Sequence, residues 1–362
     1  MKNIALVLTL FTLVGCATQQ DYRLLVGTYT RDNDSKGIYT LKVDPAKKSY
    51  TVLDTNSSVT NPSFLAVFPD KVYSIGENRD QGSVHAFDFD PASGKLEALN
   101  SLDADGSGSC SVTATPEHVI IANYRSGNLN VFSLNPDGSL NQLVQSIQHS
   151  GGSVNSERQK GPHAHQVIFD PSGMYLFSNN LGNDLIYAYR YQPDGSATPL
   201  VPVDSLMMEE GGGPRHLAIG PDGTTLYVLQ ELTGNVSIVS FTDNKLRLLG
   251  SVSLVTRPGM SGAADIHLSP DGMFLYATNR IDYNEISVFR IKTPTVLELV
   301  AQYSTEGKTP RNFMITKDGR YLFVGNQDTH EIVVFSRDLR RGTLTDTGFR
   351  IPIPAPVCHL EF

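Results

Sequence analysis

Two histidines stand two residues apart in the segment GPHAHQVIFDPSG, residues 161–173. On an extended strand, residues i and i+2 face the same side, so His163 and His165 could present two imidazole rings in one direction. Such a pair could serve acid–base chemistry near neutral pH, bind a transition metal, or do neither. A metal ion would need at least one further ligand, and no HExxH motif or cysteine cluster supplies it. Acid–base chemistry is therefore favoured, and no metal or cofactor is predicted.

The histidine segment is one copy of a repeat. Each copy contains an apolar strand, a polar turn that is often Pro-Asp-Gly, and a second apolar strand. A third strand follows, in which apolar and polar residues alternate as in an antiparallel sheet. The turns lie at steps of 47, 55, 50, 49 and 47 residues, at Pro69, Pro116, Pro171, Pro221, Pro270 and Lys317.

A period near 50 residues with four strands per copy predicts the blades of a β-propeller. The C-terminal VCHLEF matches the first strand of the repeat, and its missing second and third strands appear at the N-terminus as RLLVGTY and GIYTLKV. We therefore expect one all-β domain over residues 23–362, with seven blades of four antiparallel strands. The last blade is closed by strands from both chain ends. Cys110 and Cys358 fall on non-adjacent blades and are predicted to be free thiols.

Two positions of the repeat should lie near the central channel: the start of the innermost strand and the residue after the second strand. The first position holds Ser63, Cys110, His165, Arg215, Ala264, Arg311 and Pro356. The second holds Tyr29, Glu77, Tyr124, Leu181, Glu231, Arg280 and Gln327. One histidine, three arginines and two glutamates gather there, mainly in blades three to six. Polar groups of mixed sign around one mouth predict a site for a small anionic ligand.

At these residues the sequence resembles the lactonase family of seven-bladed propellers, which includes bacterial 6-phosphogluconolactonase and a fungal carboxymuconate cyclase. The matching pieces are GPHAHQVIFDP, GGGPRHLAIGPDG with LQE, AADIHLSPDG with ATNR, and TPRNFMITKDG with GNQ. The resemblance runs from about Arg23 to Phe362 and implies a site at His165, Arg215, Glu231 and Arg280. It leaves open which lactone is used and whether the substrate carries phosphate.

The chemistry of lactone hydrolysis suits these residues. Glu231 or His165 could act as general base or acid, because histidine titrates near neutral pH and burial can raise the pKa of a glutamate. Arg215 and Arg280 could hold an oxyanion, a carboxylate or a phosphate. The expected substrate-binding residues are His163, Asp265, His267, Arg311 and Gln327. A muconate-type lactonising cycloisomerase and a non-enzymatic propeller that binds carbohydrate or protein remain alternatives, because propellers host many functions.

The N-terminus has the pattern of an export signal. Lys2 precedes an apolar stretch over residues 4–14 that is too short to span a membrane, and the stretch ends in LVGC. That ending resembles the lipobox of bacterial lipoproteins, which implies lipidation of Cys16. We expect a signal peptide over residues 1–16, a linker over 17–22, and export to the bacterial envelope with membrane contact only through this anchor. The net charge of -8 and the absence of basic clusters exclude nucleic acid as an expected partner.

Overall fold

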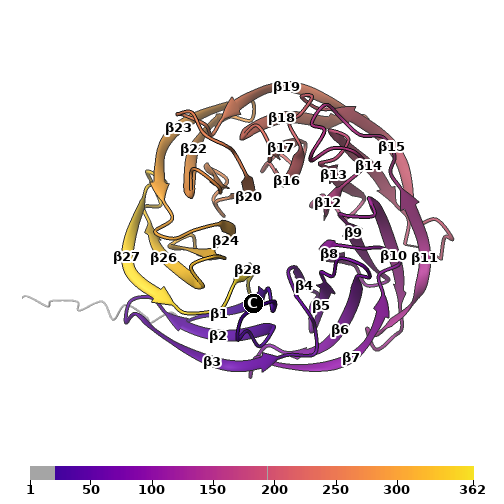
Figure 1. Ribbon diagram of the computed structural model, residues 1–362, viewed down its shortest axis with the longest axis horizontal. Helices are drawn as coiled ribbons and strands as arrows, with labels where there is room; N and C mark the ends of the chain where they lie inside the picture. Colours follow the sequence, from indigo (N-terminus) through magenta and orange to yellow (C-terminus); the bar gives the residue numbers. More distant parts are fainter. Residues whose placement is uncertain (1–20, 194) are drawn as a thin grey trace, which may run out of the picture.

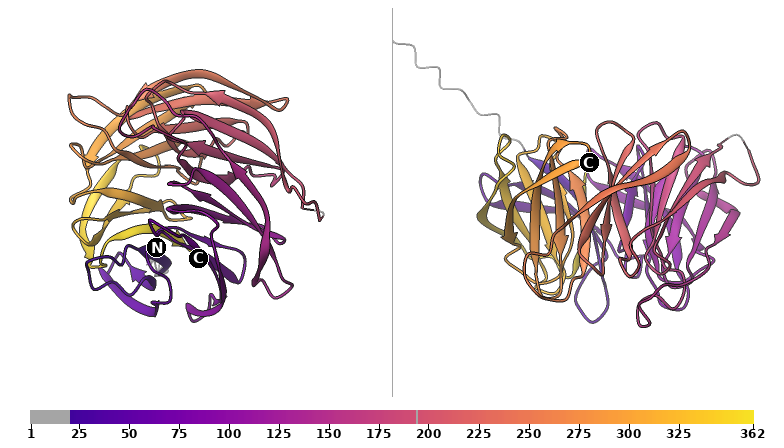
Figure 2. Two further views of the ribbon diagram at one scale, coloured as in Figure 1. Left: turned by 45° about the vertical axis from the view of Figure 1, so that its right-hand side comes forward. Right: turned by 90° about the horizontal axis from the view of Figure 1, so that it is seen from above.

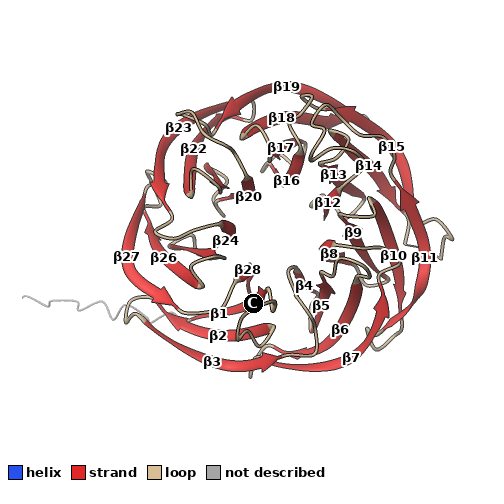
Figure 3. Ribbon diagram, viewed as in Figure 1, coloured by secondary structure: helices blue, strands red, loops and turns tan. Residues whose placement is uncertain are grey.

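The computed structural model describes residues 21–193 and 195–362, and these form a closed ring of seven sheets around a central channel (Figure 1). Each sheet has four strands, every neighbouring pair is antiparallel, and the described residues contain no helix (Figure 3). The predicted all-β propeller with seven blades is confirmed. The signal peptide, Cys16 and most of the linker lie outside the described residues.

The strands of the first four blades, from the innermost outward, have the following bounds. They are β28 (Pro356–Glu361), β1 (Tyr22–Thr28), β2 (Ile38–Asp44) and β3 (Ser49–Asn56); then β4 (Leu65–Val67), β5 (Lys71–Gly76), β6 (Ser83–Asp90) and β7 (Lys95–Asp103). The next two blades are β8 (Ser109–Ala114), β9 (His118–Asn123), β10 (Asn128–Leu134) and β11 (Leu140–Gln148); and β12 (Ala164–Phe169), β13 (Tyr175–Asn180), β14 (Leu185–Tyr191) and β15 (Leu200–Met207).

The last three blades in chain order follow the same plan. They are β16 (Pro214–Ile219), β17 (Thr225–Gln230), β18 (Asn235–Thr242) and β19 (Lys245–Ser253); β20 (Ala263–Leu268), β21 (Phe274–Asn279), β22 (Glu285–Thr293) and β23 (Val296–Ser304); and β24 (Pro310–Ile315), β25 (Tyr321–Asn326), β26 (Glu331–Arg337) and β27 (Leu344–Ile351). The strands run between the two faces of the ring (Figure 2), so the starts of the innermost strands share one face.

The Pro-Asp-Gly turns join the first and second strands of a blade. In the turn after β16, the Gly223 N–H donates to the Gly220 carbonyl at 2.9 Å. Gly223 has a φ of 70°, in the left-handed region that a side chain disfavours, so glycine suits this position. The short turn returns the chain directly to the sheet, and the second strand therefore ends beside the start of the first.

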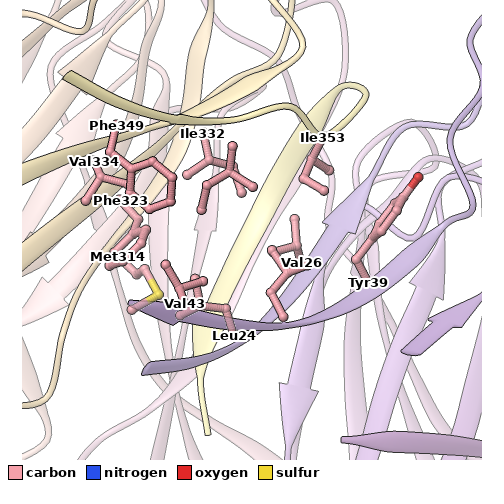
Figure 4. Packing of buried hydrophobic residues seen from close by; sticks show 12 residues of the cluster. Leu24, Val26, Tyr39, Val43, Met314, Phe323, Ile332, Val334, Phe349 and Ile353 are labelled. Atoms are coloured by element: carbon pink, nitrogen blue, oxygen red, sulfur yellow. The ribbon is translucent and has the colours of Figure 1, made fainter. Parts of the chain in front are cut away.

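The hydrophobic core lies between the blades and leaves the channel to other side chains. Among the described residues, buried apolar side chains form seven clusters, one between each pair of neighbouring blades. The cluster in Figure 4 joins Leu24 and Val26 of β1 to Phe323 of β25 and Val334 of β26. Removing such apolar surface from water stabilises the fold by about 25 cal/mol per Å². Because the closing blade packs against its neighbour through one of these clusters, it is held in the ring in the same way as the other blades.

Both chain ends contribute to the closing blade, as predicted. In it, β28 pairs antiparallel with β1, with His359 opposite Val26. Cys110 and Cys358 are buried free thiols, which confirms that prediction too. Within the described ranges, no helix has the length and apolar character needed to cross a membrane.

Candidate active site

Innermost strands of several blades carry a β-bulge where they begin at the channel. In β12, the residues on either side of His165 pair with adjacent residues of β13, so His165 itself has no partner there. The same irregularity recurs in β8, β16 and β24, and leaves unpaired Cys110, Arg215 and Arg311. A bulge bends the strand and changes the direction of the extra side chain. The first predicted repeat position therefore coincides with the bulge.

The residue that follows the second strand of each blade is held by one repeated backbone contact. The Glu231 N–H donates to the Gly213 carbonyl, two residues before the bulge, at 2.7 Å. The equivalent donors in the other blades are Tyr29, Glu77, Tyr124, Leu181, Arg280 and Gln327. In the closing blade the acceptor is Ala355 and the unpaired residue is Val357. The expectation of Pro356 at that first position is thus wrong by one residue. The register between β28 and β1 shifts at this point, so that Pro356 still pairs with β1 and Val357 is the residue left without a partner.

These positions meet in a cavity of about 400 Å³ at the channel mouth. It is lined by the predicted His165, Glu231, Arg280 and Arg311, together with Tyr29, Glu77, Cys110, Tyr124, Arg158, Ile281 and Thr309. A second cavity of about 580 Å³ shares Arg280 and Arg311 with it and includes the predicted Gln327. The other predicted residues, His163, Arg215, Asp265 and His267, line neither cavity.

Glu231 is the centre of the charged groups. Its carboxylate lies 2.7 Å from Arg158 Nη2, 2.9 Å from Arg215 Nε and 3.2 Å from Arg280 Nη2. Burial alone would raise the pKa of Glu231, as the sequence argument assumed, but the three arginines together lower it to about 2. Glu231 is therefore ionised throughout the physiological range and is a weak proton acceptor.

Arg158 was not among the residues predicted from the sequence. It lies in the long connection between β11 and β12, and its side chain is 40% exposed. Besides Glu231, it donates to the Tyr124 hydroxyl at 3.3 Å. The repeat contained a signal for it, since the step of 55 residues from Pro116 to Pro171 is the longest of the five. The extra residues form the connection that carries Arg158 to the cavity.

Arg215 lies behind Glu231 and does not line the cavity wall. Its side chain is only 2% exposed. Its Nη1 donates to the Ala264 carbonyl and approaches Nε2 of His216 at 3.3 Å. The sequence predicted that Arg215 could hold an anion; in the structure its buried guanidinium pairs with Glu231.

His165 lines the cavity with a neutral imidazole ring. It is a buried residue, 5% exposed, and its pKa is well below the ordinary value because of burial, Arg215, His216 and Arg311. Among the described residues, its ring nitrogens contact one hydrogen-bonding side chain, that of Cys110, whose Sγ is 4.0 Å from Nδ1. A neutral imidazole keeps a lone pair on one ring nitrogen, so this ring can accept a proton.

His163 and His165 do not converge on one point, because His163 precedes β12. The His163 ring stacks on Tyr124, with ring centroids 4.4 Å apart, whereas the edge of His165 meets the same tyrosine at 5.4 Å. Nδ1 of His163 donates to the Tyr124 carbonyl at 2.8 Å. Within the part of the chain that the structure describes, no group of three or more histidine, cysteine, aspartate or glutamate residues could hold a metal ion.

Arg311 lies on the opposite side of the cavity from these histidines. Its guanidinium carbon is 5.2 Å from the centre of the Tyr29 ring, and its Nη2 is 3.9 Å from Glu77 Oε2. The same Glu77 oxygen accepts hydrogen bonds from the Tyr29 hydroxyl at 2.8 Å and from Ser63. Arg311 is therefore held by a ring face and a distant carboxylate, which leaves its N–H groups available to an anion.

Asp265 and His267 lie further along β20, below the cavity. Asp265 accepts from His216 Nδ1 and from His267 Nε2, each at 2.8 Å, and from Asn312 Nδ2 at 2.6 Å. His216 was not predicted from the sequence. Its ring lies 6.0 Å from that of Phe64, which belongs to the opposite side of the ring of blades. Side chains therefore fill the channel at this depth and form the floor of the cavity.

Comparison with known proteins agrees with this architecture. Residues 23–360 match the family described as lactonase, 7-bladed beta-propeller. The 6-phosphogluconolactonase of Bacillus subtilis is 34% identical over 92% of this chain and 96% of its own length. A crystal structure of a putative 6-phosphogluconolactonase from Bacteroides fragilis is 35% identical, with a TM-score of 0.90 over 96% of this chain and 99% of that one.

A second similar structure is that of a protein described as periplasmic. The periplasmic gluconolactonase of Pseudomonas aeruginosa is 31% identical, with a TM-score of 0.89, over 94% of this chain and 99% of that one. The family match and these identities extend over nearly the whole ring, including every blade that contributes to the cavity. The chain therefore belongs to the lactonase family of seven-bladed β-propellers, as its motifs predicted.

Proposed function

We propose that this chain hydrolyses a sugar lactone in the cavity lined by His165, Glu231, Arg280 and Arg311. One observation carries the proposal: a neutral imidazole, held by burial and nearby cations, faces a cavity whose walls bear guanidinium groups. Lactone hydrolysis needs this combination of a base for water and positive charge for a developing oxyanion. The relatives named 6-phosphogluconolactonase support the same reaction class.

In this proposal His165 handles the proton in both steps. Water adds to the lactone carbonyl carbon while His165 accepts one of its protons, and the carbonyl electron pair moves onto the oxygen. The bond to the ring oxygen then breaks, and protonated His165 returns the proton to the leaving alkoxide. The lowered pKa of His165 assists this second transfer. The product is an open-chain hydroxy acid, which releases its own proton to solvent.

Arg280 and Arg311 stabilise the oxyanion in this scheme. Burial lowers the pKa of Arg280 to about 9, so it remains a cation at neutral pH. Its Nε is engaged by the Gly262 carbonyl at 2.7 Å and one Nη by Glu231, which holds the guanidinium plane in one orientation. Fixed donors stabilise charge without reorganising during the reaction.

Glu231 acts as the support for these cations, and Arg215 acts as its buried counter-ion. Three guanidinium groups contact the carboxylate, and its pKa of about 2 makes it a poor proton acceptor. Of the two candidate bases, His165 is therefore the one that this proposal uses. Neutralising Glu231 would release Arg280 from the orientation that the oxyanion requires.

A proton-release assay tests the function directly. The chain from residue 17 onward contains the whole closed ring and would be tested against aldonolactones with and without phosphate, and against a muconate-type dicarboxylate. We expect acid release above the spontaneous rate from at least one sugar lactone, with the activity lost in His165→Ala. Equal rates in the two proteins, lactone formation from the dicarboxylate alone, or sugar binding without turnover would each contradict the proposal.

We propose as well that the chain is exported and anchored through lipidated Cys16. The support is the N-terminal pattern of Lys2, an apolar stretch and LVGC, and the similar protein of Pseudomonas aeruginosa is named periplasmic. Cell fractionation of the full chain and Cys16→Ser provides the test. We expect the parent in the membrane fraction and the variant outside it; the same distribution for both would contradict anchoring at Cys16.

A further inference from the structure

A histidine below the cavity connects the second buried carboxylate to Arg215. His216 directly follows the bulge residue Arg215 and is 4% exposed. Its Nδ1 is 2.8 Å from Asp265 Oδ1, and its Nε2 is 3.3 Å from Arg215 Nη1. His216 lines neither cavity, and the proposed reaction gives it no proton to transfer.

The partners of His216 determine which ring nitrogen carries the proton. An arginine has only N–H donors, so the nitrogen facing Arg215 must accept. An ionised aspartate only accepts, so the nitrogen facing Asp265 must donate. His216 is thus neutral and protonated on Nδ1. Burial first, and then Arg215, lowers the pKa of His216 to about 4, in agreement with a neutral ring.

The contact with His216 also determines the orientation of Arg215. The two N–H groups of Nη1 go to the His216 ring and to the Ala264 carbonyl. A guanidinium is planar, so holding one end in two directions fixes the whole group. The Nε atom then lies 2.9 Å from Glu231 Oε2. The orientation of Arg215 is therefore set from below, on the side away from the cavity.

We propose that Asp265 and His216 are positioning residues for the active site: Asp265 holds His216 in the Nδ1–H tautomer, and the Nε2 lone pair of that tautomer orients Arg215 against Glu231. This inference rests on the proposed function, because it assigns the pair an effect on turnover. Its structural part, the tautomer, is independent of any substrate.

The variant Asp265→Asn reverses the tautomer. Oδ2 of Asp265 accepts from Asn312 Nδ2 at 2.6 Å, from the Phe313 N–H at 3.2 Å and from His267. These donors would keep the oxygen of the new amide on that side and turn its NH₂ group toward His216. The ring must then accept at Nδ1 and carry its proton on Nε2, where it meets the N–H of Arg215.

The first measurement is the ¹⁵N shifts of the His216 ring in ¹⁵N-histidine-labelled protein. We expect a protonated Nδ1 in the wild type and a protonated Nε2 in Asp265→Asn. In the same variant kcat should fall on the order of 10- to 100-fold, the scale for partners that orient an active-site group, while KM changes less than about threefold. Asp271→Asn serves as the control: it removes a carboxylate paired with Arg337 in the β20–β21 turn and should change neither constant.

Two substitutions at His216 separate positioning from folding. His216→Gln keeps an acceptor near the Arg215 side and loses the donor to Asp265, whereas His216→Asn keeps only the donor. We expect His216→Gln to retain kcat within about tenfold and His216→Asn to fall as far as Asp265→Asn. Equal loss in both variants, or a wild-type ring protonated on Nε2, would overturn the proposal. If the wild type hydrolyses no lactone, the proposed function fails, while the ring shifts still decide the tautomer.

Discussion

Two buried carboxylates in the same channel are held in different ways. Glu231, at the cavity, lies against three guanidinium groups, from Arg158, Arg215 and Arg280. Asp265, at the floor, accepts from two histidines, one asparagine side chain and one backbone N–H. The arginine partners of Glu231 are cations at neutral pH, whereas the histidine partners of Asp265 differ from each other: His216 is neutral, and the pKa of His267 is raised above its ordinary value.

The different surroundings of Glu231 and Asp265 suit two different tasks. Around Glu231 the charges are constant, so the cavity presents the same positive field to a substrate at any physiological pH. Around Asp265 the contacts are directional hydrogen bonds, which decide where a proton sits on His216. In the proposed reaction the group that changes protonation is His165, which lies between the two sets and whose ring centroid is 5.3 Å from that of His216.

The largest expected effect is a fall in kcat when His165 is substituted. If Glu231 is permanently ionised, the base must be the imidazole, and His165→Ala should lower kcat about 10²- to 10⁴-fold. His163→Ala is the matched control, because His163 stacks on the same Tyr124 from outside the cavity and should cost less than about tenfold. Steady-state kinetics on both variants measure this. Equal losses of kcat in the two variants would contradict the assignment of the base to His165.

The next effect is on stability. Glu231→Gln leaves the buried Arg215 without its counter-charge, and removing one partner of a buried pair costs about 3–5 kcal/mol. Asp265→Asn preserves most of its hydrogen bonds and should cost about 1–3 kcal/mol. The free energy of unfolding, measured by denaturant titration, checks the order of the two variants. A larger loss of unfolding free energy for Asp265→Asn would show that the hydrogen bonds of Asp265 stabilise the channel more than the ion pairs of Glu231 do.

A smaller effect distinguishes Arg158 from Arg215. Arg158 is 40% exposed and lines the cavity, so Arg158→Ala should raise KM about three- to tenfold, roughly one hydrogen bond to a substrate, with kcat nearly retained. Arg215→Lys should instead lower kcat, because a single ammonium cannot replace the planar fork between Glu231 and His216. The separation of kcat from KM is the measurement, and identical patterns in the two variants would contradict their assigned positions.

The smallest effect is a pH dependence at the floor. Burial alone would lower the pKa of His267, but Asp265 raises it above the ordinary value. A raised histidine pKa stabilises the fold below the unfolded-state value near 6.5, and this contribution is lost as pH rises through the folded-state pKa. Melting temperatures of wild type and His267→Gln should therefore differ most at pH 6 and converge at higher pH.

Glu231 differs from His267 in the pH range over which it contributes to stability. Its pKa is depressed to about 2, so its contribution to stability is complete above about pH 4.5 and is lost only as pH falls toward 2. Melting curves of wild type and Glu231→Gln should therefore keep a constant separation between about pH 6 and 8, below the pKa of about 9 of its partner Arg280. A separation that changed across this range would show that a partner of Glu231 titrates.

The ring and the two repeat positions could be predicted from the sequence because both depend on a period of about 50 residues and on turn residues. These two features of the sequence could not establish how far along the channel each side chain lies. Period-two alternation places Arg215 and His216 on opposite faces, but the bulge allows both to contact each other inside the channel. Arg158 was missed for a different reason, since its connection lies outside the strand pattern and its neighbours in space come from other blades.

The pH dependence of kcat/KM for the preferred lactone, between pH 4 and 7.5 and corrected for spontaneous hydrolysis, tests the central assignment most directly. We expect the wild type to be constant near neutral pH and to fall on the acid side through one ionisation below pH 6.5, because the pKa of His165 is lowered by burial and its cationic neighbours. In His165→Gln that ionisation should be absent and the remaining rate should rise with hydroxide. An unchanged acid limb in His165→Gln, with activity retained, would contradict the assignment of His165 as the base.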